Sequence, residues 1–336
     1  MLIRVKELRM NILVTGGAGY IGSHTCKELA ARGHTVTVYD DLSTGWRDLV
    51  KWGDLVQGDI RDTEKLTNAL RGCRAEGVIH FAGKSYVGDS VRMPGEYYSN
   101  NVAGTLSLLE AMREADVGRV IMSGTCSVYG QPEEMPISEN TSLNPINPYG
   151  RTKLFMECIL QDFEHAHGLN WMSLRYFNAA GCDADGETGE RHVPETHLIP
   201  RVLMAAAGEI PHLELFGDDY DTPDGTCIRD YIHVRDLAVA HVLALEHLGQ
   251  GGSSMPLNLG TGTGLSVRQI IGASERVSGR RVPVIVKARR EGDPAVLTAD
   301  AGRAREVIGW TPQFSSVEDV IASAWKWLLT DKPVPS

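Results

Sequence analysis

The stretch TGGAGYIGSHT, residues 15–25, follows the apolar run 12–14 and opens a segment with helical spacing. Its glycines satisfy G-x-G-x-x-G from Gly17 and G-x-x-G-x-x-G from Gly16. A glycine turn between a strand and a helix lets the backbone approach a pyrophosphate, which the N–H groups of the helix N-terminus bind. Glycine spacing alone is a weak signal, so the flanking strand and helix support the prediction of a dinucleotide site.

Acidic residues at the ends of the next two strands fit this interpretation. Asp40 ends the second strand and lies 18 residues beyond Gly22 (40 − 22), near the spacing of about 20 typical of a ribose-binding acid. A 2′-phosphate would face Asp40 and Asp41, which favours NAD over NADP; the alternative is a solvated strand end. Asp59 follows the third strand, where it would reach an adenine amino group.

Apolar runs rich in β-forming residues alternate with longer helical patterns, which predicts an α/β, Rossmann-like doubly wound parallel sheet. The predicted strands are 11–15, 35–39, 55–57, 77–81, 119–123 and 171–177. The predicted helices are 20–32, 63–71, 97–115 and 149–167.

The alternation of strand and helix patterns ends after residue 178, where the segment 181–191 is rich in Gly and Asp. Beyond it we expect helices near 198–207, 234–248 and 267–278 and strands near 213–216 and 283–286. We therefore predict an NAD-binding domain at 10–180 and a smaller C-terminal α/β substrate domain at 181–336, partly interleaved with the first.

Composition restricts the class of protein. The net charge of −10 and the pI near 5.6 argue against binding to nucleic acid, which needs a basic face. No run approaches the roughly 18 apolar residues of a membrane span, and residues 1–10 lack the apolar segment of a secretory signal. Six cysteines without C-x-x-C pairs predict reduced thiols in the cytoplasm. We expect no metal, and we interpret the acidic run 218–224 as a turn.

Tyr149 and Lys153 lie four residues apart in a predicted helix and so share one face. A lysine ammonium and a nicotinamide cation would lower the pKa of the phenol, so that Tyr149 can take a hydroxyl proton while hydride leaves the same carbon. A hydroxyl partner is expected after the preceding strand. Thr125 is the first choice, with Ser123 and Ser127 as alternatives.

The chain resembles the extended short-chain dehydrogenase/reductase family, and within it the UDP-sugar 4-epimerases, from about residue 11 to 329. The glycine loop and PYGRTK (148–153) are shared by the whole superfamily. IRDYIHV (228–234) and RREGDP (289–294) are far more specific to nucleotide-sugar epimerases. The resemblance implies reversible, NAD-dependent inversion at C4 of a UDP-sugar, UDP-glucose or UDP-galactose, through a 4-keto intermediate in a homodimer.

The resemblance also implies site residues. Tyr149 is the base, Lys153 its electrostatic partner and a ribose ligand, and Thr125 the hydroxyl that contacts the reacting sugar. Cofactor contacts are implied for Gly16, Gly19, Tyr20, Ile21, Gly22, Asp40, Asp59, Ile60, Phe81, Ala82, Lys84, Asn101, Tyr149, Lys153 and Phe177. Positions that hold the UDP-sugar are Thr125, Asn178, His197, Leu198, Phe216, Arg229, Arg290, Asp293 and Leu297.

Two positions depart from many relatives: Gly124 replaces a serine before Thr125, and His197 replaces an asparagine found in some. The two arginines would converge on the pyrophosphate; the alternative is surface pairing of Arg229 with Asp230 and of Arg290 with Glu291. Leu297 matches a position beside the C2 substituent of the sugar, and its small size implies room for an N-acetyl group.

Other functions make different demands on the sequence. A nucleotide-sugar dehydratase needs an Asp-Glu pair after the catalytic threonine, where this chain has Cys126 and Ser127. A non-catalytic NAD-sensing protein would have no need of Tyr149 and Lys153. An epimerase of the pentose pair UDP-xylose and UDP-arabinose would use the same machinery, so hexose and pentose substrates both stay open.

Overall fold

The computed structural model describes residues 9–290, 293–314 and 316–331, and the chain divides into two compact units. Unit 1 comprises Met1–Gly124, Asn147–Leu174 and Ala238–Pro256. Unit 2 comprises Thr125–Ile146, Arg175–Leu237 and Leu257–Ser336.

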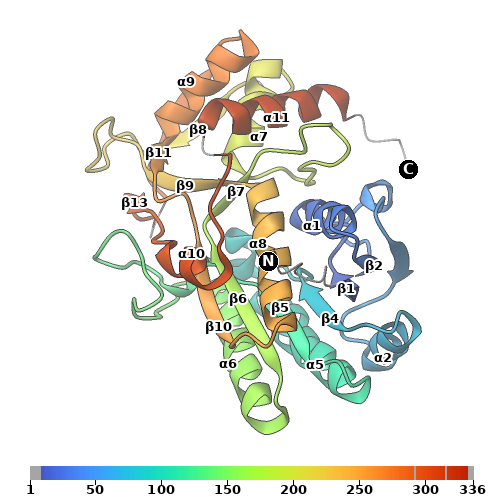
Figure 1. Cartoon of the computed structure of the whole chain (residues 1–336). Helices are drawn as coiled ribbons and strands as arrows, with labels where there is room; N and C mark the ends of the chain where they lie inside the picture. Colours follow the sequence, from blue (N-terminus) through green and yellow to red (C-terminus); the bar gives the residue numbers. More distant parts are fainter. Residues whose placement is uncertain (1–8, 291–292, 315, 332–336) are drawn as a thin grey trace, which may run out of the picture. The chain divides into compact units, whose positions relative to one another are not determined.

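The largest sheet in the described residues has seven strands in the order β10-β6-β5-β4-β1-β2-β3, and most of them are labelled in Figure 1. Its strands are β1 (Asn11–Thr15), β2 (Thr35–Asp40), β3 (Asp54–Gln57), β4 (Gly77–His80), β5 (Arg119–Ser123), β6 (Asn170–Tyr176) and β10 (Met255–Leu259). The ladders from β6 to β3 are parallel. The predicted doubly wound parallel sheet is confirmed, and β10 is a strand that the sequence analysis did not predict.

Helices follow the strands as predicted, with one difference. The long ones are α1 (Tyr20–Ala31), α2 (Thr63–Gly72), α5 (Gly104–Glu114), α6 (Pro148–His167) and α8 (Val234–Gly249). The single helix expected at 97–115 is instead α4 (Pro94–Tyr97), a π-helical turn η2 (Tyr98–Ala103) and α5, after a short α3 (Val87–Arg92). A π turn inserts one extra residue per turn and often marks a functional site.

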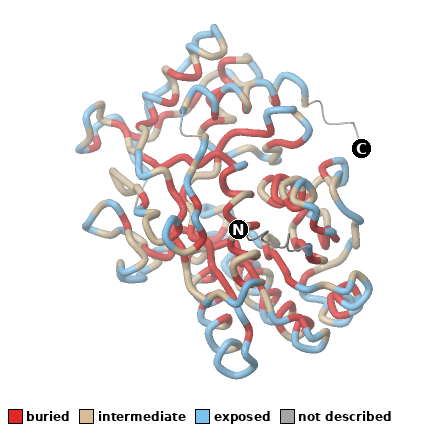
Figure 2. The backbone as a smooth tube through the Cα atoms, in the orientation of Figure 1, coloured by how far each residue is buried: buried red, intermediate tan, exposed pale blue. Residues whose placement is uncertain are grey.

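The core of unit 1 lies between the sheet and helices α2, α5 and α6, where Figure 2 shows the strands as buried. Leu13 and Val78 of the sheet pack with Leu66, Leu108 and Met156, one from each helix, and all five are fully buried. These central strands are apolar on both faces, as expected of a parallel sheet covered by helices.

The order of the strands reverses direction at β1, which pairs with β2 on one side and β4 on the other. In open α/β sheets, ligands bind at such a switch point, outside the carboxyl ends of the strands. The glycine turn follows β1 directly, so the fold places it at that end of the sheet.

Unit 2 contains two small sheets. Strands β7 (Asn178–Ala180), β9 (Ile228–His233), β11 (Gly264–Ser266) and β13 (Val296–Leu297) form one, and β8 (Leu213–Phe216) and β12 (Val284–Lys287) the other. The helices of unit 2 are α7 (Leu198–Ala207), α9 (Val267–Ser278), α10 (Gly302–Ile308) and α11 (Val317–Thr330). Two short 3-10 turns are η1 (Arg47–Leu49) in unit 1 and η3 (Cys126–Val128) in unit 2. The predicted α7, β8 and α9 are confirmed, whereas β9 and α11 were not predicted. Among the helices of the described residues, none has the length and hydropathy required to cross a bilayer.

Candidate active site

The glycine turn after β1 brings two backbone segments into very close contact. Gly16 has φ +71°, donates its N–H to Tyr39 O at 2.9 Å, and would place a β-carbon 2.5 Å from Ala82 N. A β-carbon on Gly22 would overlap the carbonyl oxygen of Gly16. The glycines therefore allow a left-handed turn and close strand–helix packing, and the N–H groups of the first turn of α1 have no partner within the helix.

Asp40 lies at the end of β2 against this turn. Its carboxylate accepts the N–H of Ala18 at 3.0 Å and of Leu42 at 2.8 Å. Burial raises the pKa of Asp40, although both backbone donors lower it. The residue is only 8% exposed, so Asp40 is held in place and is not a solvated strand end.

The π turn η2 positions Asn101 beneath the segment that follows β4. The Asn101 amide accepts the N–H of Lys84 at 2.8 Å and donates to Lys84 O at 2.9 Å and to Thr152 Oγ1 at 3.1 Å. The Thr152 hydroxyl in turn donates to Tyr149 O at 2.7 Å. Asn101 thus connects the β4 loop to the first turns of α6. The Lys84 ammonium itself pairs with Glu96 at 2.5 Å.

Helix α6 carries the predicted catalytic pair. Asn147 caps it by accepting the N–H of Gly150 at 2.8 Å, and Pro148 occupies the first helical position. Tyr149 is half-buried, whereas Lys153, one turn later, is 4% exposed and donates from Nζ to Ser123 O at 2.8 Å. Burial lowers the pKa of Lys153 to about 8, against the nearby Glu157, which raises it.

The three hydroxyl candidates occupy different settings. Ser123 ends β5, and its carbonyl serves Lys153. Thr125, the first residue of unit 2, is 6% exposed, and its Oγ1 caps η3 by accepting the N–H of Ser127 at 3.2 Å. Because Thr125 Oγ1 accepts this bond through a lone pair, its hydroxyl proton can still be donated to another group.

The four-stranded sheet of unit 2 carries three of the predicted substrate residues. Asn178 pairs with Tyr231, and Leu297 pairs with Arg229. Arg229 is 9% exposed and lies 2.5 Å from Asp293. Asp230 instead accepts N–H groups of the 261–262 turn, so the surface pairing of Arg229 with Asp230 does not occur. The alternative partner of Arg290, Glu291, lies outside the described residues.

Arg290 stacks on an aromatic ring. Its guanidinium carbon lies 4.0 Å from the ring centroid of Phe216, the last residue of β8. Asp293 donates its N–H to Arg290 O at 3.3 Å. Arg229, Arg290, Asp293 and Phe216 are therefore neighbours within unit 2, and Asp293 links the two arginines.

His197 immediately precedes Leu198, the first residue of α7, and its Nδ1 lies 2.7 Å from Glu190 Oε1 and 3.3 Å from Glu195 Oε1. Burial alone would lower the pKa of His197, but the two carboxylates outweigh it and raise the pKa to about 10. The sequence analysis predicted a contact of His197 with the sugar nucleotide and missed this cluster.

The other predicted cofactor residues occupy mixed environments. Tyr20 and Ile21 begin α1, and Ile60 is buried beside Gly104.

The Phe81 ring packs on His241 with centroids 4.6 Å apart. Asp59 accepts Nε of Arg61 at 2.9 Å, and this pairing lowers its pKa. Phe177, between β6 and β7, is buried in unit 2.

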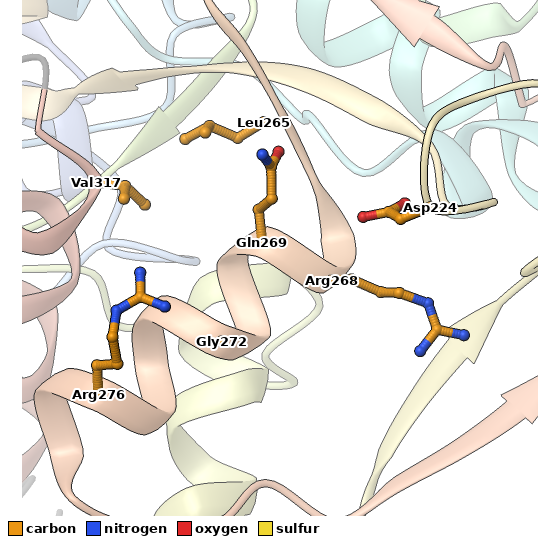
Figure 3. Close-up of a pocket in the computed structure, with 7 residues that line it drawn as sticks. All are labelled: Asp224, Leu265, Arg268, Gln269, Gly272, Arg276 and Val317. Carbon is orange, nitrogen blue, oxygen red and sulfur yellow. The ribbon is translucent and has the colours of Figure 1, made fainter.

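A cavity of about 460 Å³ in unit 2 contains none of these residues. Figure 3 shows Gln269 and Arg276 of α9 pointing toward Leu265 and Val317, and Arg268 pointing away. Arg276 already pairs with Glu318 at 2.7 Å, and Asp224 bonds to Ser266. The cavity is therefore a gap between paired side chains and not the predicted site.

Sequence reasoning also missed His80, at the end of β4. Its imidazole lies 2.7 Å from Thr15 Oγ1 and 3.1 Å from Thr105 Oγ1. Burial, and then the charge of Lys153, lower the pKa of His80 to about 3, so the ring is neutral. A single histidine in an apolar run shows no pattern from which its burial beside Thr15 and Thr105 could be predicted.

The chain is similar to known proteins over most of its length. The sequence matches the profile described as NAD dependent epimerase/dehydratase family over residues 12–260. It is 50% identical over 317 residues to the UDP-glucose 4-epimerase of Rhizobium meliloti, covering 94% of this chain and 96% of that protein.

Two solved structures are also similar. UDP-glucose 4-epimerase from Brucella ovis in complex with NAD matches with a TM-score of 0.93 at 54% identity, over 94% of this chain and 98% of that one. The enzyme of the same name from Bifidobacterium longum, in complex with NAD+ and UDP, matches with a TM-score of 0.89 at 40% identity, over 95% and 98% of the two chains.

Proposed function

This chain belongs to the NAD dependent epimerase/dehydratase family, and on that premise we propose that it inverts C4 of a UDP-sugar, interconverting UDP-glucose and UDP-galactose. The observation that carries the proposal is the pair on α6. Tyr149 lies one turn before Lys153, whose buried ammonium is held by the carbonyl of Ser123. A protein that only binds NAD has no need of that arrangement.

The glycine turn fits NAD. Side chains at Gly16 and Gly22 would fill the close approach between β1, α1 and the β4 segment, and the first turn of α1 offers N–H groups to a pyrophosphate. Asp40, buried and oriented by two backbone donors, is suited to bind a ribose hydroxyl and to repel a 2′-phosphate. Bound there, NAD would accept a hydride from C4 and return it to the opposite face of the sugar.

Tyr149 acts as the base in this proposal. It removes the proton of the C4 hydroxyl as the C4–H bond breaks, which leaves a 4-keto sugar, and it returns the proton when C4 is reduced. Lys153 stabilises the phenolate by its charge, and at pH 7 it is mostly protonated because its pKa is about 8. Thr125 donates a hydrogen bond to the reacting oxygen.

The proposed substrate contacts are concentrated on the UDP part of the UDP-sugar. Arg229 and Arg290, with Asp293 between them, would bind the pyrophosphate, and the stacking of Arg290 on Phe216 leaves the edge of its guanidinium available for an anion. A sugar that must present both faces is held loosely, so the binding energy has to come from the part of the substrate remote from C4.

Leu297 is proposed to border the C2 substituent of the sugar. It lies on β13 opposite Arg229, the residue assigned to the pyrophosphate. A leucine there leaves more room than a tyrosine, so we propose weaker activity on UDP-N-acetylglucosamine beside the main activity.

Assembly and location complete the proposal. We propose a homodimer that forms through helices α3, α5 and α6 of unit 1, on which Val91, Leu106 and Phe155 are 62%, 44% and 46% exposed. All six cysteines are free thiols, which supports a cytoplasmic location.

The direct test incubates the purified full chain, without added NAD, with UDP-galactose and with UDP-xylose in separate reactions. We expect UDP-glucose from the first. Product from UDP-xylose alone would identify a pentose epimerase. No product from either, in protein that carries NAD, would refute epimerisation.

A further inference from the structure

Four ionisable side chains of the segment 190–197 converge in unit 2. They are Glu190, His192, Glu195 and His197, and one nitrogen or oxygen atom of each lies within 4.8 Å of those of the other three. The segment leads directly into α7 at Leu198. Neither the cofactor site nor the pyrophosphate site requires two histidines and two carboxylates in one place.

The distances within the cluster match those between ligands of one small cation. His192 Nδ1 lies 3.4 Å from Glu190 Oε1 and 3.3 Å from Glu195 Oε2, and His197 Nδ1 lies 3.3 Å from Glu195 Oε1. A tetrahedral Zn²⁺ with nitrogen and oxygen ligands at about 2.0–2.2 Å separates its ligands by roughly 3.3–3.6 Å. Three of the four histidine–carboxylate separations already have that value.

The fourth separation is shorter. Glu190 Oε1 lies 2.7 Å from His197 Nδ1 in an ion pair that raises the pKa of His197, and the Glu190 side chain is only 5% exposed. A bound metal ion would take the place of the proton on His197, because an imidazole that ligates a metal is neutral.

Neighbouring groups orient the two carboxylates. Glu195 Oε1 accepts the N–H of Thr196 at 2.7 Å and of His197 at 2.8 Å, which directs Oε2 toward His192. The Glu190 backbone is fixed by Trp327 of α11, whose Nε1 donates to Glu190 O at 2.9 Å. Such support orients the ligands of metal sites and tunes their affinity. The His197 side chain, 46% exposed, leaves a path for an ion to enter.

We propose that Glu190, His192, Glu195 and His197 bind one divalent transition-metal ion of the Zn²⁺ type, which ties the segment before α7 together. Two imidazoles exclude Ca²⁺ and Mg²⁺, which take oxygen ligands, and suit Zn²⁺ and its first-row neighbours. His197 is also a predicted contact of the UDP-sugar, so metal binding is measured directly and not through activity. The proposal departs from the expectation, drawn from the sequence, that the chain binds no metal.

A second acidic group in unit 2 provides a matched control. Asp183, Asp185 and Glu187 also lie within 4.8 Å of one another but contain no nitrogen ligand. Asp185 is exposed, so Asp185→Asn removes one carboxylate without disturbing the core. His165, exposed on the last turn of α6, controls for adventitious binding to a surface histidine.

The test titrates ZnCl₂ into the chelator-treated full chain by calorimetry and repeats the titration with CoCl₂ by visible absorption. We expect one equivalent of Zn²⁺ to bind and Co²⁺ to give the intense bands of a tetrahedral site. His192→Asn should weaken binding by at least about 100-fold, since changes in the supporting groups alone cost 10–100-fold. His165→Asn and Asp185→Asn should bind like the wild type.

Three outcomes would overturn the site. The first is a wild type that takes up no stoichiometric Zn²⁺, which would leave an ion-pair cluster only. The second is a Co²⁺ spectrum with only the weak bands of an octahedral, water-rich site. The third is loss of binding in Asp185→Asn with binding retained in His192→Asn, which would place the ion elsewhere. Because His197 is half exposed, His197→Asn replaces His192→Asn if circular dichroism shows that the latter is unfolded.

Discussion

Lys153 Nζ donates to the main-chain oxygen of Ser123 at 2.8 Å, which joins the end of β5 to α6 through a buried cation. The contact fixes where α6 lies along the sheet, and it fixes Tyr149 one turn earlier on the same face. The charge that is expected to activate the phenol is therefore also part of the framework that positions it. This dual role makes substitution of Lys153 ambiguous and substitution of Tyr149 informative.

Tyr149→Phe keeps the ring and removes the proton acceptor. We expect kcat to fall by about 10²–10⁴-fold, the usual contribution of a general base. NAD content and UDP affinity should be unchanged, because the main-chain contact of Tyr149 with Thr152 remains. Steady-state kinetics and calorimetry with UDP measure the two effects. Activity within about threefold of the wild type would assign the base to another residue.

Cofactor retention tests the role of Asp40. A reaction that returns its cofactor to the starting state favours tight binding, so denaturation of the purified chain should release close to one NAD per chain and little NADP. Asp40→Asn should retain less NAD, because an amide accepts a hydrogen bond from a ribose hydroxyl less strongly than a carboxylate does. The amide also no longer repels a 2′-phosphate, so discrimination against NADP should fall. Chromatography of the released nucleotide gives the answer, and a predominance of NADP would contradict our interpretation of Asp40.

Gly16→Ala should damage the nucleotide site. Alanine at φ +71° is strained by roughly 1–3 kcal/mol, and its β-carbon would lie 2.5 Å from Ala82 N. We expect lower stability in urea and loss of bound NAD. Gly72→Ala is the matched control, because a β-carbon there meets nothing within 4 Å at the end of α2. Equal stability of the two variants would show that the turn after β1 tolerates a side chain.

His80 predicts acid sensitivity. Its folded-state pKa, about 3, is below the ordinary 6.5, so between these values the unfolded chain binds the extra proton and stability falls as pH falls. The slope from this one group approaches about 1.4 kcal/mol per pH unit. His80→Gln should be less stable at pH 7 and lose less stability between pH 6.5 and 4, whereas His165→Gln should follow the wild type. Urea unfolding across this range checks both; parallel curves for wild type and His80→Gln would contradict the prediction.

Leu297→Tyr should change the sugar preference. A larger ring excludes an acetamido group strongly, whereas the roomier wild-type pocket loses only about 1–3 kcal/mol of contact with the smaller sugar. We expect activity on UDP-N-acetylglucosamine to be abolished and turnover of UDP-galactose to stay within a few-fold. Leu297→Met, similar in volume, is the control. Equal losses on both sugars, or no N-acetyl activity in the wild type, would contradict this assignment.

The sequence predicted most strands of unit 1 well because they are apolar on both faces, and helices α2 and α6 begin with the capping side chains of Asp62 and Asn147. It missed β9, where Arg229 and Asp230 break the apolar pattern. Asp230 is fully buried and is satisfied by backbone N–H groups of the turn at 261–262, contacts that only the folded chain makes. The cluster at 190–197 escaped notice for a similar reason, since its ligands lie in a segment without helix or strand and show no periodicity.

The order in which the chain builds its two units bears on its synthesis. The chain passes between the units five times, at 124/125, 146/147, 174/175, 237/238 and 256/257. Unit 1 therefore has all its segments only after residue 256 has been synthesised, although the glycine turn after β1 is synthesised early. The glycine turn thus belongs to an incomplete unit for much of translation. A gene cut at 124/125 yields a fragment with all of unit 2, and a cut at 256/257 yields one with all of unit 1. A cut at any of the three crossings between them leaves neither unit whole, so two halves divided there must complete each other's units when they meet.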